Sequence, residues 1–295
     1  MRVSRSLPLL AAALLAAAPL HAQTRIRQRP TGSLDALSDE FAGAASLARW
    51  TRFDTAGGWP DVFRRLEVDT AAGTLVVEPW TSGWYADFHG AYLSQRVEGD
   101  FDVTVRLQAT GLATPVPTRN WSLAGLMVRE PRPVTPATWT PGGENWLFLT
   151  TGTGDRPEPM FETKSTVNSR SNLKLRPAKA GWVELRIVRL RDAFVLLRRL
   201  EGETAWTVQE RFLRRDLPPT VEVGLAAYTD WDSAERFWRD PRAFNTTRIT
   251  DGRPDLRVTV DWIRFRRPAL AEGFWPETLT DYSVSNDDVA RALGG

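Results

Sequence analysis

The fold of this chain is limited most strongly by a series of short segments in which apolar and polar residues alternate. Clusters of turn-forming residues separate these segments. Segment 101–108 is the clearest, because its odd positions are all apolar: Phe101, Val103, Val105 and Leu107. Period-two alternation of this kind predicts a β-strand with one buried face. Similar strand-like runs follow at 121–129, 145–151, 182–190, 193–200, 221–228 and 256–265. Many short strands with regular turns predict an all-β fold, a two-sheet antiparallel β-sandwich or a barrel.

Three local patterns add detail to this expectation. Segments 65–69 and 74–78 flank Ala72-Gly73 and predict a β-hairpin. Residues 287–293 predict a short terminal helix, with Ser285 or Asn286 as its N-cap. Residues 232–253 are polar and irregular, and we expect them to form a surface loop.

The first residues predict export. Two arginines precede an apolar run from 7 to 20, and Ala22 offers a small residue for cleavage, a pattern typical of a secretory signal peptide. The apolar run is shorter than the roughly 20 residues of a membrane span, so we expect no span after cleavage, although a retained anchor stays open. The expected organisation is therefore a signal peptide (1–22), a polar tether (23–34), one sandwich (35–267) and a C-terminal extension (268–295), in a periplasmic or extracellular protein.

Composition and the absence of certain motifs exclude several classes of function for this chain. The chain has no cysteine, so thiol chemistry is excluded. Loss of Arg2 and Arg5 with the signal takes the formal net charge from +2 to zero, which argues against a nucleic-acid partner. His89 is the one histidine beyond the signal, which excludes a histidine-cluster metal site. No Gly-x-Ser-x-Gly elbow is present to suggest a serine hydrolase.

Several segments resemble, in order and spacing, concanavalin A-like domains of secreted bacterial proteins. They are Asp39-Glu40-Phe41, Gly90-Ala91-Tyr92-Leu93, Val97–Val103, Ala124–Arg129, Asn145-Trp146, Trp182–Ile187 and Val223–Tyr228. That superfamily includes uncharacterised and regulation-of-enolase-type proteins, and modules beside the catalytic domain of some β-xylosidases. The resemblance implies a two-sheet jelly roll with a concave face, but no single activity, because lectins, glucanases and binding modules share it.

Carbohydrate is the expected ligand, bound by stacking on some of the 13 tryptophans. The stretch 80–89 concentrates aromatic rings with Asp and His, and polar residues on later strands suggest the floor of a groove. The candidate ligand-binding residues are Trp80, Trp84, Tyr85, Asp87, His89, Arg129, Glu144, Trp146, Lys164 and Arg170. The alternative for the rings is a purely structural role in the core.

Other functions stay open beside a non-catalytic, lectin-like protein that binds an oligo- or polysaccharide. The glucanase branch of the superfamily uses spaced carboxylates on one strand, and the nearest match here is Glu98, Asp100 and Asp102, which would support a glycoside hydrolase or lyase. An envelope protein-interaction module is the third alternative. No cofactor is expected, except that Asp39 and Asp261 would offer hard oxygen ligands to Ca²⁺ if the first and last strands pair.

Overall fold

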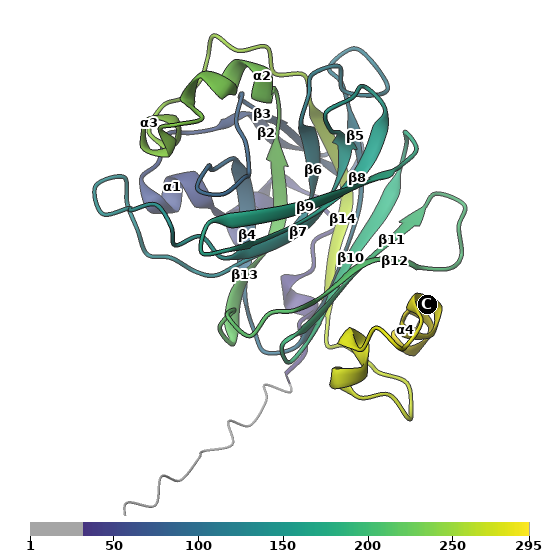
Figure 1. The fold of residues 1–295 in the computed structure, drawn as a ribbon. Coiled ribbons are helices and arrows are strands. Elements are labelled where there is room, and N and C mark those ends of the chain that lie inside the picture. Colours follow the sequence, from purple (N-terminus) through teal and green to yellow (C-terminus); the bar gives the residue numbers. More distant parts are fainter. Residues whose placement is uncertain (1–31, 295) are drawn as a thin grey trace, which may run out of the picture.

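The computed structural model describes residues 32–294, and the predicted signal peptide lies outside them. Two seven-stranded antiparallel sheets lie face to face (Figure 1), which confirms the predicted β-sandwich. Sheet A has the strand order β12 (Thr207–Leu213), β11 (Ala193–Leu200), β10 (Val183–Leu190), β5 (Phe101–Thr110), β14 (Arg257–Arg266), β3 (Thr74–Pro79) and β2 (Phe63–Asp69). Sheet B has the order β1 (Thr51–Arg52), β4 (Ala91–Glu98), β13 (Thr220–Tyr228), β6 (Ser122–Arg129), β7 (Trp146–Thr153), β8 (Pro159–Val167) and β9 (Arg170–Pro177).

The space between the sheets is filled by the apolar faces that alternation predicted. On β5, the side chains of Phe101, Val103, Val105 and Leu107 are all fully buried in this core. The predicted hairpin is β2–β3, in which Val68 pairs with Leu75. Because successive side chains of a strand point to opposite faces, the polar positions of these strands lie outside the core.

Short helices connect or flank the strands: η1 (Asp35–Leu37), η2 (Ala44–Arg49), α1 (Phe53–Gly57), α2 (Trp231–Ala234), η3 (Glu235–Phe237), α3 (Pro241–Asn245), η4 (Pro276–Thr280) and α4 (Asn286–Ala292). Helix α4 is the predicted terminal helix, and Ser285 caps it by accepting a hydrogen bond from the amide of Asp288. Segment 232–253 is more ordered than the expected loop. Asp240 caps α3, and Phe244 of α3 packs in a small apolar cluster. The helices of this segment are too short to show a helical periodicity of apolar residues in the sequence.

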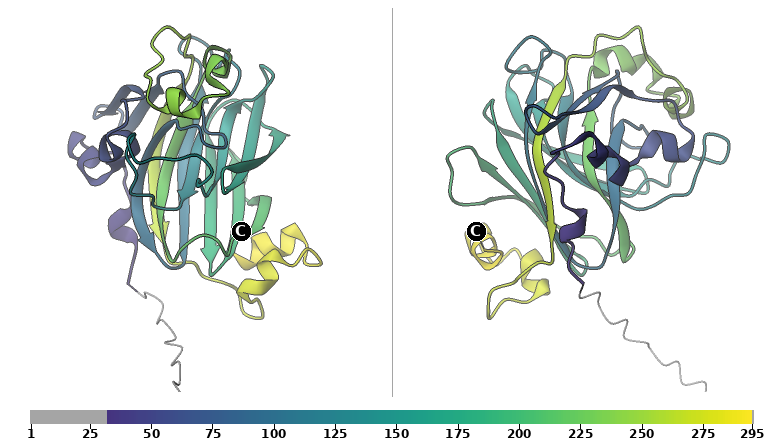
Figure 2. Two further views of the ribbon diagram at one scale, coloured as in Figure 1. Left: turned by 60° about the vertical axis from the view of Figure 1, so that its left-hand side comes forward. Right: turned by 180° about the vertical axis from the view of Figure 1, so that it is seen from behind.

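The outer faces of both sheets are partly covered by the chain itself. The C-terminal segment packs its apolar residues, including Leu279, Val289 and Leu293, against β10–β12 of sheet A and lies at the end away from α2 and α3 (Figures 1 and 2). The β3–β4 loop covers the middle of the outer face of sheet B with Trp84, which packs on Trp146. No helix in residues 32–294 combines the length and the hydropathy of a membrane-crossing segment.

Candidate functional site

A pocket remains open beside Trp84 on the outer face of sheet B, and we call it the aromatic pocket. Its cavity volume is about 190 Å³. Eight residues from three strands, two loops and helix α2 line it: Gly83, Trp84, Tyr85, Trp121, Lys164, Leu173, Tyr228 and Trp231. Tyr85 is exposed, and Trp121 and Trp231 are half-buried, so three aromatic side chains keep surface that a ligand can touch.

The aromatic walls come from distant parts of the sequence, and sheet pairing brings them together. Strands β6 and β13 pair so that Leu123 lies opposite Tyr228. Trp121 directly precedes β6 and Trp231 follows β13, so the pairing places both tryptophans at the same end of the sheet. The amide of Trp231 donates to the carbonyl of Asn120 at 3.3 Å, which fixes the two loops to each other.

Lys164 is the cation of the aromatic pocket. Its Nζ donates to the carbonyl of Trp84 at 2.7 Å and forms an ion pair with Oε1 of Glu162 at 2.9 Å. An ammonium group carries three N–H donors. These two contacts use two of the three donors. The aromatic rings of Tyr85, Tyr228 and Phe148 lie within 5.5 Å of Nζ.

The charge of Lys164 is balanced at the floor of the pocket. Glu162 is fully buried, accepts a hydrogen bond from the hydroxyl of Tyr228 and lies on the same strand face as Lys164. Burial lowers the pKa of Lys164, and the carboxylate of Glu162 opposes that shift. Burial raises the pKa of Tyr228 well above its usual value, and Glu162 adds to the rise, so the phenol stays protonated.

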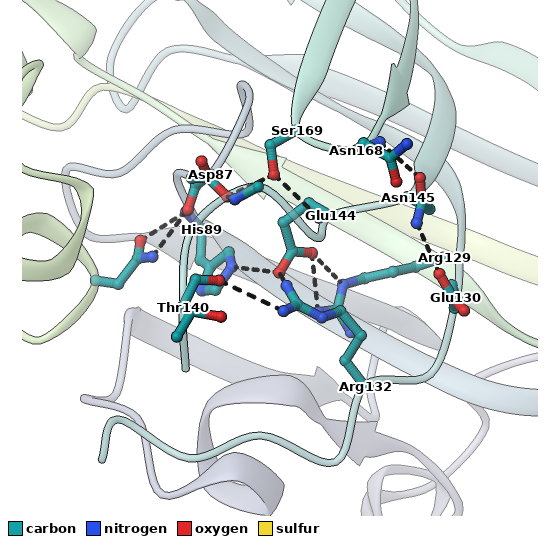
Figure 3. Close-up of polar contacts among 12 residues, drawn as sticks. Asp87, His89, Arg129, Glu130, Arg132, Thr140, Glu144, Asn145, Asn168 and Ser169 are labelled. Carbon is teal, nitrogen blue, oxygen red and sulfur yellow. Dashed lines mark hydrogen bonds and ion pairs between the residues drawn. The ribbon is translucent and has the colours of Figure 1, made fainter. Parts of the chain in front are cut away.

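A second polar centre, which we call the Glu144 cluster, lies on the same sheet (Figure 3). The fully buried carboxylate of Glu144 accepts from Nε and Nη2 of Arg129 at 3.2 and 3.0 Å. It also accepts from Nη1 of Arg132 and lies 3.2 Å from Nε2 of His89. The rings of Phe53, Trp59, Trp84 and Trp139 surround His89, with centroids 5.0 to 5.9 Å away.

The ionisation states in the Glu144 cluster follow from burial and from its arginines. Burial would raise the pKa of Glu144, but Arg129, His89 and Arg132 outweigh burial and hold it well below its usual range. Burial lowers the pKa of His89, and Glu144 offsets only part of that effect. At neutral pH the cluster therefore contains a carboxylate, two guanidinium groups and a neutral imidazole.

The ten predicted ligand residues fall into separate places. Trp84, Tyr85 and Lys164 line the aromatic pocket, whereas His89, Arg129 and Glu144 form the Glu144 cluster, which Asp87 adjoins through Ser169. Trp80 lies elsewhere, with its amide bonded to the carbonyl of Val62, and Arg170 is exposed at the start of β9.

Two of the predicted stacking tryptophans have no free face. Trp84 and Trp146 are each fully buried. Trp146 stacks on Phe148 at a centroid distance of 5.1 Å, and Trp84 packs against Trp146 edge-on. The prediction that a sugar stacks on Trp84 and Trp146 is therefore wrong, because the faces of both rings are covered by other side chains of the protein.

The carboxylates considered for calcium or catalysis have other partners. Asp39 bridges the last strand at Ile263, but its side chain accepts from Trp50 Nε1 at 2.9 Å and pairs with Arg49. Asp261 pairs with Arg106 at 2.7 Å. In the described part of the chain no group of three His, Cys, Asp or Glu is arranged to hold a metal ion.

The acidic series Glu98, Asp100 and Asp102 does not share a strand face. Strand β4 ends at Glu98 and β5 begins at Phe101, so a turn through Gly99 separates the carboxylates. Asp102 accepts two hydrogen bonds from Arg186, at 2.8 and 2.7 Å, on the outer side of sheet A beneath the C-terminal segment. This arrangement corrects the suggestion that the three acids form a catalytic row.

Sequence reasoning missed several residues of this region, namely Trp121, Trp231, Tyr228, Leu173 and Glu162. Trp121 begins the predicted strand 121–129 and Trp231 follows the predicted strand 221–228, and such positions are a usable signal for the end of a sheet. Nothing in the sequence, however, indicates that the strands beside them are neighbours. Glu162 lies two residues before Lys164, and this i, i+2 spacing was the available sign of a shared face.

Solved structures show the fold, whereas no protein-family model and no curated protein matches the chain. A functionally unknown protein from Saccharomyces cerevisiae is 18% identical, with a TM-score of 0.50, over 75% of this chain and 98% of its own. A GH43 protein from Bacillus licheniformis is 14% identical over 78% of this chain, with a TM-score of 0.51. A xylan β-1,4-xylosidase from Bacillus halodurans is 13% identical over 78%, with a TM-score of 0.50. The chain spans 39% of the length of each of these two Bacillus proteins. At these identities the likeness shows the two-sheet β-sandwich fold alone.

Proposed function

We propose that this protein binds a carbohydrate in the aromatic pocket and does not cleave it. The observation that carries the proposal is the set of accessible rings, Tyr85, Trp121 and Trp231, around the ammonium group of Lys164. Flat aromatic faces suit the C–H face of a sugar, and a directed donor fixes its orientation. The sandwich shared with a GH43 protein and a xylosidase supports the same ligand class. Export, from the pattern of the first 22 residues, is part of this proposal.

The size of the pocket favours the end of a glycan over its middle. About 190 Å³ is smaller than the ~300–1,000 Å³ typical of pockets that enclose small molecules. Trp84 and the β3–β4 loop fill the centre of the sheet face, so no continuous groove crosses it there. We therefore expect recognition of a terminal sugar residue.

Hydrolysis is the second candidate, and the lining of the pocket argues against it. Glycoside hydrolysis ordinarily uses two carboxyl groups that flank the scissile bond. None of the described residues lining the aromatic pocket is acidic. Glu162 is fully buried and is held by Lys164 and Tyr228, so its carboxylate serves to keep Lys164 in place.

A glycan array on the purified protein, followed by product analysis of each hit, tests the proposal. We expect retention of a defined set of glycans, loss of that retention in Trp121→Ala, and no new reducing ends or unsaturated sugars. Trp275→Ala is the matched control, because Trp275 is exposed and lies in the C-terminal segment. Absence of any glycan hit contradicts binding, whereas product formation favours the enzyme alternative.

A further inference from the structure

A second pocket on the outer face of sheet B is lined by arginines, and we call it the arginine pocket. Its cavity volume is about 380 Å³, and Arg96, Arg129 and Arg132 line it together with Glu222. Thr51 and Ser94 add hydroxyl groups to its wall. It shares no lining residue with the aromatic pocket, and the packed pair of Phe53 and Trp84 lies between them.

Strand register places the charges of the arginine pocket in one row. Glu222 of β13 lies directly opposite Arg96 of β4 on one side and Arg129 of β6 on the other. Directly opposed residues of neighbouring strands have their Cβ atoms about 4.5–5.5 Å apart on the same face. The pairing of three strands therefore gathers two guanidinium groups around one carboxylate.

The Glu144 cluster holds two of the arginines before any ligand arrives. Glu144 accepts from two donors of Arg129 and one of Arg132, and Glu222 accepts from Nη1 of Arg129 at 3.2 Å. A guanidinium group has five N–H donors. Arg129 thus keeps two donors beyond these three bonds, in a side chain that is buried and unable to move away.

The charge balance of the arginine pocket is positive and favours an anionic ligand. Three guanidinium groups meet two carboxylates, those of Glu222 and Glu144, and His89 is neutral because burial lowers its pKa. Arg96 is exposed, and no acidic side chain in residues 32–294 pairs with it. One positive charge is therefore uncompensated within the pocket.

We infer that the arginine pocket binds an oxyanion, the carboxylate of an acidic sugar or a phosphate group, with Arg96 and Arg132 as its contact residues. Guanidinium groups present paired donors that match both anions. Glu144 acts as a positioning residue, since it is fully buried and holds Arg129 and Arg132 from behind. The inference is independent of sugar binding in the aromatic pocket, because the two sites have different walls.

Isothermal titration of the full protein at low ionic strength, with D-glucuronate and with inorganic phosphate as separate probes, tests the inference. We expect saturable binding of at least one probe, weakened on the order of tenfold in Arg96→Gln and partly restored in Arg96→Lys. Arg170→Gln is the matched control, because Arg170 is also an exposed arginine of sheet B.

The pattern of results identifies the ligand or overturns the inference. Binding of glucuronate alone assigns an acidic sugar, binding of phosphate alone assigns a phosphorylated ligand, and binding of both assigns a general oxyanion site. No saturable binding of either probe overturns the inference. So does an equal loss in Arg96→Gln and Arg170→Gln, which would indicate only the overall charge of the protein.

Discussion

Glu144 shows how a single residue organises one side of sheet B. A fully buried carboxylate is costly unless charged donors surround it, and here Arg129 and Arg132 do so, while the neutral His89 lies 3.2 Å away. Removing one partner of such a buried group leaves the others uncompensated, which costs more than the pair contributes. The identity of this residue therefore governs both local stability and the geometry of two arginines.

Glu144→Gln is expected to lower the free energy of unfolding by about 3–5 kcal/mol, measured by urea denaturation at neutral pH. The amide cannot balance the charges of Arg129 and Arg132. Glu40→Gln is the control, because Glu40 pairs with Arg264 at the exposed surface and its loss should cost at most about 1 kcal/mol. Equal costs for the two variants would show that burial of Glu144 is unimportant.

The burial of His89 should make the stability of the protein depend on pH in mildly acidic solution. Burial lowers its pKa in the folded protein, so below the usual value of about 6.5 the unfolded chain binds a proton that the folded protein does not. Stability is therefore highest above that value and falls as the pH decreases, by up to about 1.4 kcal/mol per pH unit. Denaturation of the protein and of His89→Gln between about pH 7.5 and 5.5 measures the effect. Parallel curves for the two proteins would contradict it.

At the scale of elements, the β3–β4 loop decides what sheet B can offer a ligand. Trp84 anchors the loop by donating from Nε1 to the carbonyl of Ala91 at 3.1 Å and by packing on Trp146. The same loop supplies Tyr85 to the aromatic pocket, and its Trp84 carbonyl accepts from Lys164. The loop thus closes the middle of the sheet face and builds one wall of the site.

Trp84→Ala should cost about 3–5 kcal/mol of unfolding free energy, because it leaves a large cavity between the loop and the sheet. Urea denaturation measures it, with Trp238→Ala as the control, since Trp238 is an exposed tryptophan. Surface substitutions usually change stability by no more than about 0.5 kcal/mol. A cost for Trp84→Ala below about 1 kcal/mol would mean that the loop does not depend on this ring.

At the scale of the whole molecule, alternation predicted which side chains face the core, and the structure confirms it on β5. The terminal helix was also predictable, because Ser285 and the apolar spacing are local signals. The order of strands was not predictable from local pattern, since β4, β13 and β6 are neighbours although they are far apart in the sequence. For the same reason the sequence named Lys164 and Tyr85 but could not join them to Trp121 and Trp231.

The sequence left the role of Trp84 and Trp146 open between ligand stacking and core packing, and local pattern could not decide between the two. Both lie on the outer face of a sheet or in a loop, where exposure is the ordinary expectation. Their burial depends on a loop folding back over the sheet, a long-range contact that no local periodicity reports. Of the aromatic residues that were predicted to bind a ligand, some therefore line a pocket and others only pack inside the protein.

The most direct test of the account measures the affinity of the protein for a glycan retained on the array, by tryptophan fluorescence, in Trp121→Ala, Trp231→Ala and Trp275→Ala. If the aromatic pocket is the binding site, the first two substitutions should weaken binding on the order of tenfold or more, and the third should leave it unchanged. Unaltered affinity in both pocket variants would contradict the assignment of the aromatic pocket as the binding site.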